Sequence, residues 1–259
     1  MSTKSSRLSR PWLNILADRA EYAVMFTSRG DTGDLTDPYS AFSLCHYTGD
    51  TPQHVAHCRG MLADTLKIAD GRIIVPRQTH STRVVTIDSL PVSDAAIEGA
   101  DGVVTTLRDV AVGVSTADCV PVIAVDSEAG VAGAFHAGWR GAVGGIVAAG
   151  VEAMTAAGAL AGRIEAYIGP SICCSCFEVG EEVAAFFPEE FVVRKKEWPK
   201  PHVDLPAYVE SRLIEAGVVA GNIRSFTGDI CTRCHPDKYF SARAAGIASG
   251  RNFTFAILR

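Results

Sequence analysis

The chain has 259 residues, of which 47% are hydrophobic and 20% charged, proportions typical of a globular protein with a sizeable core. Its 24 basic and 29 acidic side chains give a net charge of -5, without a basic stripe, which argues against binding to nucleic acid or to an anionic membrane. No apolar run is long enough to predict a transmembrane helix, and no signal-peptide segment follows residues 1–10. We therefore expect a cytoplasmic protein whose residues 1–10 form a flexible tail.

Short β-branched runs bounded by turn residues alternate with helical patterns along the chain. The expected strands are 22–27, 72–75, 83–87, 102–106, 110–115, 120–125, 130–135, 163–168, 223–226 and 252–258. Helices are expected over 51–66, 142–157 and 205–217, and the first and last begin at a residue followed by proline. Residues 11–20 carry no assignment. No linker or repeat divides the chain, so we expect one α+β (mixed α/β) domain over residues 1–259, with mixed β-sheets flanked by helices.

Three short strings, RQTH, TADCVP and HAGWRG, each carry one residue that can ligate a metal: His80, Cys119 and His136. One cysteine with two histidines is typical of a catalytic zinc, whose fourth position stays open to water or substrate. His136 is expected just past the end of strand 130–135, where the following residues turn the chain into a helix. The helix start and the guanidinium of Arg140 would then lie near the histidine and favour an anion.

Taken singly, these residues also have structural interpretations. A lone histidine at a strand end, a cysteine beside apolar strands and a tryptophan such as Trp139 are all common packing residues. The three ligand residues are far apart in sequence, so their spacing decides nothing. The residues alone therefore predict an enzyme-like α/β domain, in which Cys119 either ligates a metal or acts as a nucleophile beside a histidine.

Eight cysteines lie at positions 45, 58, 119, 173, 174, 176, 231 and 234. Cys173 and Cys176 have C-x-x-C spacing, and so do Cys231 and Cys234. The two pairs are compatible with one structural zinc site, with redox pairs, or with small buried thiols of no special role. Because the pairs are much further apart than in a usual zinc ribbon, the sequence favours the last interpretation.

Further strings accompany the ligand segments in a characteristic order. They are QTH at 78–80, ADCVP at 117–121, HAGWRG at 136–141, IGPSI at 168–172, FEVG at 177–180, CT at 231–232 and YFSAR at 239–243. From about Phe42 to its C-terminus the chain resembles the laccase-domain proteins. These were once called multicopper polyphenol oxidases and are now regarded as zinc-containing purine nucleoside phosphorylases; bacterial relatives are also named peptidoglycan editing factors.

The resemblance implies a zinc ion held by His80, Cys119 and His136, in a mixed α/β fold related to that of deamidase toxins. It implies phosphorolysis of adenosine, inosine and S-methyl-5'-thioadenosine to the free base and ribose 1-phosphate or its methylthio analogue. Adenosine deamination is implied as a further activity. Purine nucleosides and phosphate would then be the binding partners of a monomer or homodimer.

For such a reaction, Cys119, His136 and Arg140 are the expected catalytic set. Arg140 is the best candidate for binding phosphate. Arg59 and Arg243 are further candidates for substrate or phosphate, and a solvated surface arginine is the alternative for each.

The chain departs from the family pattern at several positions. Ser81 replaces a usual glycine, which predicts an altered turn after His80. Ser43 stands where asparagine is common, and Ala244 where a second arginine often follows the first. Cys173 and Cys174 replace smaller or proline-like residues.

Rival chemistries leave weaker or no signatures. Multicopper centres need many histidines, usually in His-x-His pairs, and none of the seven histidines forms such a pair, which excludes laccase chemistry. The His-x-Glu and Pro-Cys-x-x-Cys signature of zinc deaminases is absent as well. Two alternatives stay open. One is an amidase or deamidase that uses Cys119 as nucleophile and His136 as base, for example on peptidoglycan precursors; the other is a metal-stabilised interaction protein without turnover.

Overall fold

The computed structural model describes residues 10–30, 34–226 and 230–259, so the predicted tail lies outside the described residues except for Arg10. The strands are β1 (Leu13–Asp18), β2 (Tyr22–Thr27), β3 (Ile73–Ile74), β4 (Val84–Ile87), β5 (Gly102–Thr105), β6 (Ala111–Thr116), β7 (Val120–Asp126), β8 (Val131–Ala137), β9 (Glu165–Ile168), β10 (Val192–Val193), β11 (His202–Val203), β12 (Ile223–Ser225) and β13 (Asn252–Leu258). The α-helices are α1 (Pro52–Leu66), α2 (Asp94–Ile97), α3 (Trp139–Gly144), α4 (Ile146–Ala156), α5 (Glu181–Ala184), α6 (Leu205–Glu215) and α7 (Ala242–Ala245). Short 3-10 turns are η1 (Asp70–Arg72), η2 (Ala161–Arg163), η3 (Cys174–Cys176), η4 (Glu189–Phe191) and η5 (Ala220–Asn222). None of the described helices has the length and apolar composition needed to cross a membrane.

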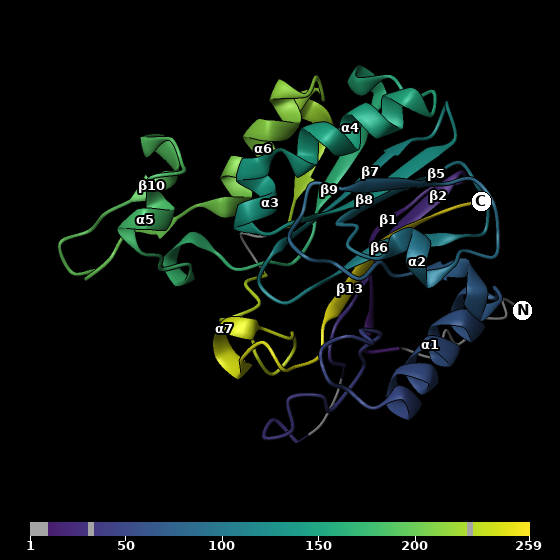
Figure 1. The fold of residues 1–259 in the computed structure, drawn as a ribbon, viewed down its shortest axis with the longest axis horizontal. Coiled ribbons are helices and arrows are strands. Elements are labelled where there is room, and N and C mark those ends of the chain that lie inside the picture. Colours follow the sequence, from purple (N-terminus) through teal and green to yellow (C-terminus); the bar gives the residue numbers. More distant parts are fainter. Residues whose placement is uncertain (1–9, 31–33, 227–229) are drawn as a thin grey trace, which may run out of the picture.

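Two mixed sheets form the centre of the molecule (Figure 1). The five-stranded sheet has the order β1-β2-β13-β6-β3, and the six-stranded sheet has the order β12-β9-β7-β8-β5-β4. Most neighbours are antiparallel, whereas β3–β6, β4–β5 and β9–β12 are parallel. The short β10–β11 ribbon lies with α5 in a segment that projects beyond the end of the sheets (Figure 1). The expected mixed α+β fold is therefore confirmed.

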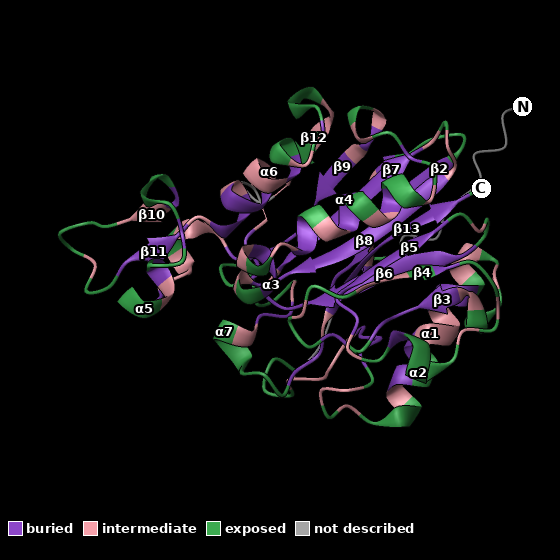
Figure 2. Ribbon diagram, turned by 45° about the horizontal axis from the view of Figure 1, so that its top comes forward, coloured by how far each residue is buried: buried purple, intermediate pink, exposed green. Residues whose placement is uncertain are grey.

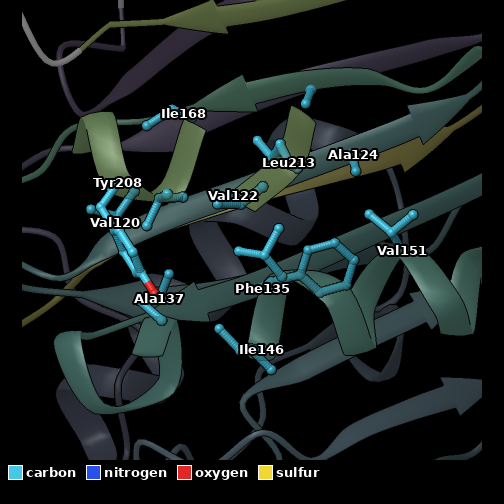
Figure 3. Packing of buried hydrophobic residues seen from close by; sticks show 14 of the residues in the cluster. Val120, Val122, Ala124, Phe135, Ala137, Ile146, Val151, Ile168, Tyr208 and Leu213 are labelled. Atoms are coloured by element: carbon cyan, nitrogen blue, oxygen red, sulfur yellow. The ribbon is translucent and has the colours of Figure 1, made fainter. Parts of the chain in front are cut away.

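The outer face of the six-stranded sheet packs against α4 and α6. Side chains of β7 alternate between the two faces, as the two-residue period of a strand requires. Val120 and Val122 join the cluster beneath the helices, whereas Ile123 points to the opposite face. Figure 3 shows Phe135 of β8 beside Val151 of α4, in the same cluster as Val122 of β7.

Two further apolar layers complete the core. Between the sheets, Ile123 packs in one cluster with residues of the five-stranded sheet such as Val112. The outer face of the five-stranded sheet places Phe253 and Phe255 in one cluster with Leu62 of α1. The layers are thus helix, sheet, sheet and helix. Figure 2 shows the central strands buried, while the covering helices expose one side to solvent.

Several boundaries differ from the sequence prediction. The segment expected as one helix over 142–157 contains parts of two helices. Gly145, whose φ is 99°, is both the C-cap of α3 and the N-cap of α4, so the chain changes direction there. Strand β8 continues to Ala137, so His136 lies inside the strand and not beyond its end. The unassigned residues 11–20 contain β1, whose partly exposed edge position gives a weak apolar pattern. Helix α1 begins as predicted, with Thr51 accepting a hydrogen bond from the N–H of His54.

Candidate metal centre

Three predicted ligands meet in the structure. One ligand atom from each of His80, Cys119 and His136 lies within 4.8 Å of the others. The Sγ of Cys119 is 3.7 Å from Nε2 of His80. The ring centroids of His80 and His136 are 4.8 Å apart, and the two rings meet edge to face. Ligands on one tetrahedral zinc lie about 3.3 to 3.8 Å apart, given bonds of about 2.0 to 2.3 Å. The cluster therefore has the dimensions of a metal site.

Two of the ligands lie where the chain passes from one sheet to the other. His80 is in the loop from β3 of the five-stranded sheet to β4 of the six-stranded sheet. Cys119 is in the short turn from β6 to β7, which belong to the same two sheets. Left-handed residues shape both turns, with φ of 62° at His80 and 86° at Asp118. His136 comes from β8, opposite Pro121 of β7.

Asp101, which the sequence analysis did not single out, is fully buried behind the ligands. Its Oδ1 accepts a hydrogen bond from Nδ1 of His136 at 2.7 Å. Its two oxygens also accept the backbone N–H groups of residues 79, 80 and 81 at 2.9, 3.0 and 2.8 Å. Because Nδ1 of His136 is engaged, its Nε2 is the nitrogen left for a metal.

The charge on Asp101 is stabilised despite its burial. Burial alone would raise the pKa of this carboxyl, but the hydrogen bonds from His136 and from the backbone N–H groups of Thr79 and Ser81 outweigh it and lower the pKa to about 2. Asp101 is therefore ionised at neutral pH and fixes both the ring of His136 and the loop of His80.

Cys119 and His136 polarise each other. Burial opposes the charged form of each, yet their mutual attraction outweighs burial: it lowers the pKa of the Cys119 thiol and raises the pKa of the His136 imidazole. His80 adds to the first shift and Asp101 to the second. Without a metal, Cys119 is a thiolate beside the imidazolium of His136. With a metal, the Cys119 thiolate would serve as an anionic ligand that is already deprotonated.

Gly138 leaves room for the ligands. A Cβ at this position would lie 2.5 Å from Cδ2 of His80 and 3.0 Å from Sγ of Cys119. The φ of Gly138 is -66°, which other residues also adopt, so the need for glycine here is one of space. The backbone of Gly138 thus forms one wall of the site.

Ser81 contributes to the turn in which the family usually has glycine. Its hydroxyl lies 2.8 Å from the carbonyl oxygen of Gly99 and 2.9 Å from Oδ2 of Asp101. The left-handed residue of this turn is His80 and not Ser81, so a side chain is tolerated. Among the other departures, Ser43 is buried and accepts the N–H of Arg251, and Ala244 is exposed on α7.

Asp118 connects the turn of Cys119 to two distant segments. Its Oδ1 accepts a hydrogen bond from the hydroxyl of Thr232 at 2.7 Å, and its Oδ2 accepts the backbone N–H of Arg243 at 2.7 Å. Its carbonyl oxygen accepts the N–H of Ile172 at 2.9 Å. The strings that contain these residues were noted in the sequence, but nothing there indicated that they converge on Asp118.

The three candidate arginines lie in different places. Arg140 is exposed on α3, with its guanidinium 4.3 Å from the centre of the Trp139 ring. The guanidinium of Arg243 donates to the carbonyl oxygen of Glu178 at 3.0 Å, while its backbone contacts the turn of Cys119.

Arg59 is bound by neighbouring residues of its own region. Its Nε donates to Asp70 at 3.0 Å, and its terminal nitrogen donates to the carbonyl oxygen of Ile73 at 3.0 Å. These contacts attach α1 to η1 and β3. The substrate or phosphate role of Arg59 stays a prediction.

Comparison with known proteins adds a family and named relatives. A family model described as multi-copper polyphenol oxidoreductase laccase matches residues 23–259. The chain is 45% identical over 240 residues to a protein named adenosine deaminase RL5, from an unknown prokaryotic organism, covering 88% of this chain and 90% of the relative. It is 34% identical over 226 residues to a purine nucleoside phosphorylase of Bacteroides thetaiotaomicron, covering 82% and 83%. The crystal structure of the hypothetical protein YfiH from Bacillus licheniformis matches with a TM-score of 0.85 and 26% identity, covering 98% of both chains.

Proposed function

This chain belongs to the multi-copper polyphenol oxidoreductase laccase family, and on that premise we propose that it is a zinc-dependent purine nucleoside phosphorylase. It transfers the ribosyl group of adenosine or inosine, or the methylthioribosyl group of S-methyl-5'-thioadenosine, to phosphate and releases the free base. The observation that carries the proposal is the His80, Cys119 and His136 cluster, in which His80 is exposed to solvent. A nucleoside can therefore approach the ligands from outside.

The donor set fits zinc. One thiolate and two imidazoles suit zinc, whereas magnesium and calcium prefer oxygen ligands. Because Gly138 has no Cβ, which would lie 2.5 Å from Cδ2 of His80 and 3.0 Å from Sγ of Cys119, both side chains can take the positions that ligands of one ion need. Among the residues that the structure describes, two groups could hold a metal, and neither contains more than two histidines. This is too few for the multicopper cluster of a laccase.

The residues around the cluster have distinct tasks. Asp101 keeps the Nδ1 proton on His136, so Nε2 is the atom with which His136 would hold a zinc ion. Cys119 supplies a thiolate, because its pKa is lowered by His136. A zinc ion bound there supplies Lewis acidity to a substrate oxygen or nitrogen.

Phosphorolysis also needs an anion site and a surface for the base. The exposed Arg140 follows His136 by four residues and offers planar N–H donors that match phosphate oxygens. Beside it, Trp139 packs against Phe186 with ring centres 5.8 Å apart, and Phe186 is 58% exposed. Because Arg140 lies over the ring of Trp139, the exposed ring of Phe186 is the aromatic face of this pair that can accept a purine by stacking. Arg243 is the second anion candidate.

Adenosine deamination is the second candidate activity, and the name of the 45% identical relative favours it. In that reaction water replaces the amino group of the base, giving inosine and ammonia without phosphate. The amidase alternative is not favoured, because the reported relatives are named for nucleoside chemistry and a bound metal would occupy the Cys119 thiolate. A cytoplasmic location and a monomeric or homodimeric state stay predictions.

The test is to incubate the zinc-loaded protein with adenosine or inosine, with and without phosphate, and to quantify base, ribose 1-phosphate and ammonia. Base release that requires phosphate, with equal ribose 1-phosphate, is expected. His80→Ala should abolish it, whereas His57→Ala, an exposed histidine on α1, should not. Ammonia without base would instead assign the deaminase alone, and neither product would reject the proposed function.

A further inference from the structure

The two C-x-x-C pairs meet in the structure, although 54 residues separate Cys176 from Cys231. The four sulfur atoms of Cys173, Cys176, Cys231 and Cys234 all lie within 4.8 Å of one another. The Sγ atoms of Cys176 and Cys234 are 3.4 Å apart. One shared metal site, an alternative that the sequence left open, therefore has the convergence of sulfur atoms that it requires. Cys174, between the first two, is not in this group.

Backbone pairing explains how the pairs come together. Ser171 and Cys231 form an isolated parallel bridge, and the N–H of Thr232 donates to the carbonyl oxygen of Ser171 at 3.1 Å. Each pair then closes a tight turn: the N–H of Cys176 donates to the carbonyl oxygen of Cys173 at 3.0 Å, and that of residue 235 to Cys231 at 3.2 Å. Two adjacent turns thus present two thiols each to a common point.

The spacing of the sulfur atoms fits a tetrahedral metal site. Four thiolates at about 2.3 Å from one zinc ion lie about 3.8 Å apart, within the range set by the observed contact of 3.4 Å and the outer bound of 4.8 Å. A disulfide would need sulfur atoms about 2.05 Å apart, and all eight cysteines are free thiols here. The arrangement also joins four sulfur atoms, whereas a redox pair needs two.

Surrounding donors would stabilise thiolates at this point. The backbone N–H of Cys173 donates to Sγ of Cys231 at 3.3 Å. The guanidinium of Arg233 donates to Sγ of Cys176 at 3.6 Å and brings a positive charge to the cluster. Hydrogen bonds and charges of this kind tune the thiolates of metal sites.

We propose that Cys173, Cys176, Cys231 and Cys234 form a structural zinc site, separate from the candidate metal centre. All four coordination positions are filled by protein, so the site holds structure and leaves no position for substrate. The zinc joins the segment after β9 to the segment after β12. Because Thr232 lies between two of its ligands and bonds to Asp118, the ion also steadies the turn that carries Cys119.

The experiment counts zinc per chain in the full-length protein by native mass spectrometry and by elemental analysis. Wild type should hold two zinc ions. Cys234→Ser, at an exposed position, should hold one, and the matched control Cys174→Ser should hold two. His80→Ala should also hold one, and combining it with Cys234→Ser should leave none. Because no turnover is measured, failure of the proposed phosphorylase activity would leave this outcome unaffected.

Cobalt substitution provides a second, spectroscopic readout, which does not depend on counting ions. Cobalt in the His80→Ala protein should give the absorption bands of a tetrathiolate complex, and Cys234→Ser should remove them. One zinc ion in wild type that Cys234→Ser retains would overturn the proposal. So would a mass two hydrogens lower, which would indicate a disulfide between the paired cysteines.

Discussion

The hydroxyl of Thr232 donates a hydrogen bond to Oδ1 of Asp118 at 2.7 Å, across 114 residues of sequence. Both residues are buried, and each is next to a cysteine that can ligate a metal. The bond therefore connects the four-cysteine cluster to the turn of Cys119. It is a hydrogen bond to a carboxylate, which is stronger than one between neutral groups.

Replacing Thr232 by valine should weaken this connection. Thr232→Val keeps the shape of the side chain and removes one donor to Asp118, so the free energy of unfolding should fall by about 2 kcal/mol. Urea denaturation of the zinc-loaded protein measures the change. The control is Thr86→Val at an exposed position of β4, where a shift within about 0.5 kcal/mol is expected. Equal effects of the two substitutions would contradict the connection.

Asp101 should be essential to the candidate metal centre. Asp101→Asn places an amide where the carboxylate accepts five donors, four of them from residues 79–81. We expect a loss of about 3 kcal/mol in stability and a roughly 10- to 100-fold weaker zinc affinity at His80, Cys119 and His136. Competition with a chromophoric chelator measures the affinity, with exposed Asp88→Asn as control. Unchanged affinity would show that Asp101 does not orient His136.

The space at Gly138 gives a selective way to disturb the ligands. Gly138→Ala is compatible with the backbone, but its Cβ would meet His80 and Cys119. The variant should fold and lose zinc from this centre, with phosphorolysis reduced at least tenfold. Gly60→Ala in α1, where a Cβ has nothing within 4 Å, should keep both the metal and the activity. Zinc analysis and a thermal melt of each variant separate loss of metal from loss of fold.

Metal occupancy should control the reactivity of Cys119. In the metal-free protein its pKa is lowered, chiefly through His136 acting against burial, so a larger fraction is thiolate at neutral pH than for an ordinary cysteine. We expect rapid labelling by iodoacetamide without metal and protection in the zinc-loaded protein, read by peptide mass spectrometry. Rapid labelling of Cys119 in zinc-loaded protein would instead support the amidase alternative.

Asp126 should make stability depend on acid pH. Its carboxylate is buried, which alone would raise its pKa, but the N–H of Leu160, the guanidinium of Arg163 and the N–H of Ala129 outweigh burial and lower it. A lowered pKa in the folded state stabilises the protein above the ordinary carboxyl value, and this contribution is lost as pH falls through the folded value.

Asp126→Asn should therefore cost about 2 kcal/mol at pH 7 and progressively less below about pH 4. Denaturant unfolding of both proteins across this range measures the difference. Asp64→Asn, exposed on α1, should show no such convergence. A difference that stays constant with pH would contradict the role of the charge.

The sequence predicts the strands and the three candidate metal ligands, but not the contacts that hold those ligands in place. Strand β2 matches its prediction at both ends, and β13 does too, because their β-branched and aromatic runs are bounded by clear turns. His80, Cys119 and His136 were identified through short strings and the family resemblance. Asp101 and Asp118 were not singled out, since their roles depend on contacts between residues that are distant in sequence. The two C-x-x-C pairs were visible in the sequence, and one shared zinc site was among their interpretations, but their convergence depends on the distant bridge between Ser171 and Cys231.

The loops of His80 and Cys119 both cross from one sheet to the other. A metal held between them would therefore restrain the position of one sheet relative to the other. Sliding of one sheet against the other would change the distance between these ligands. The affinity for the ion and the resistance of the layers to shear are then two measures of the same free energy. Mutations deep between the sheets, such as at the buried Tyr22–Tyr167 hydrogen bond, could in this way alter metal binding without contacting a ligand.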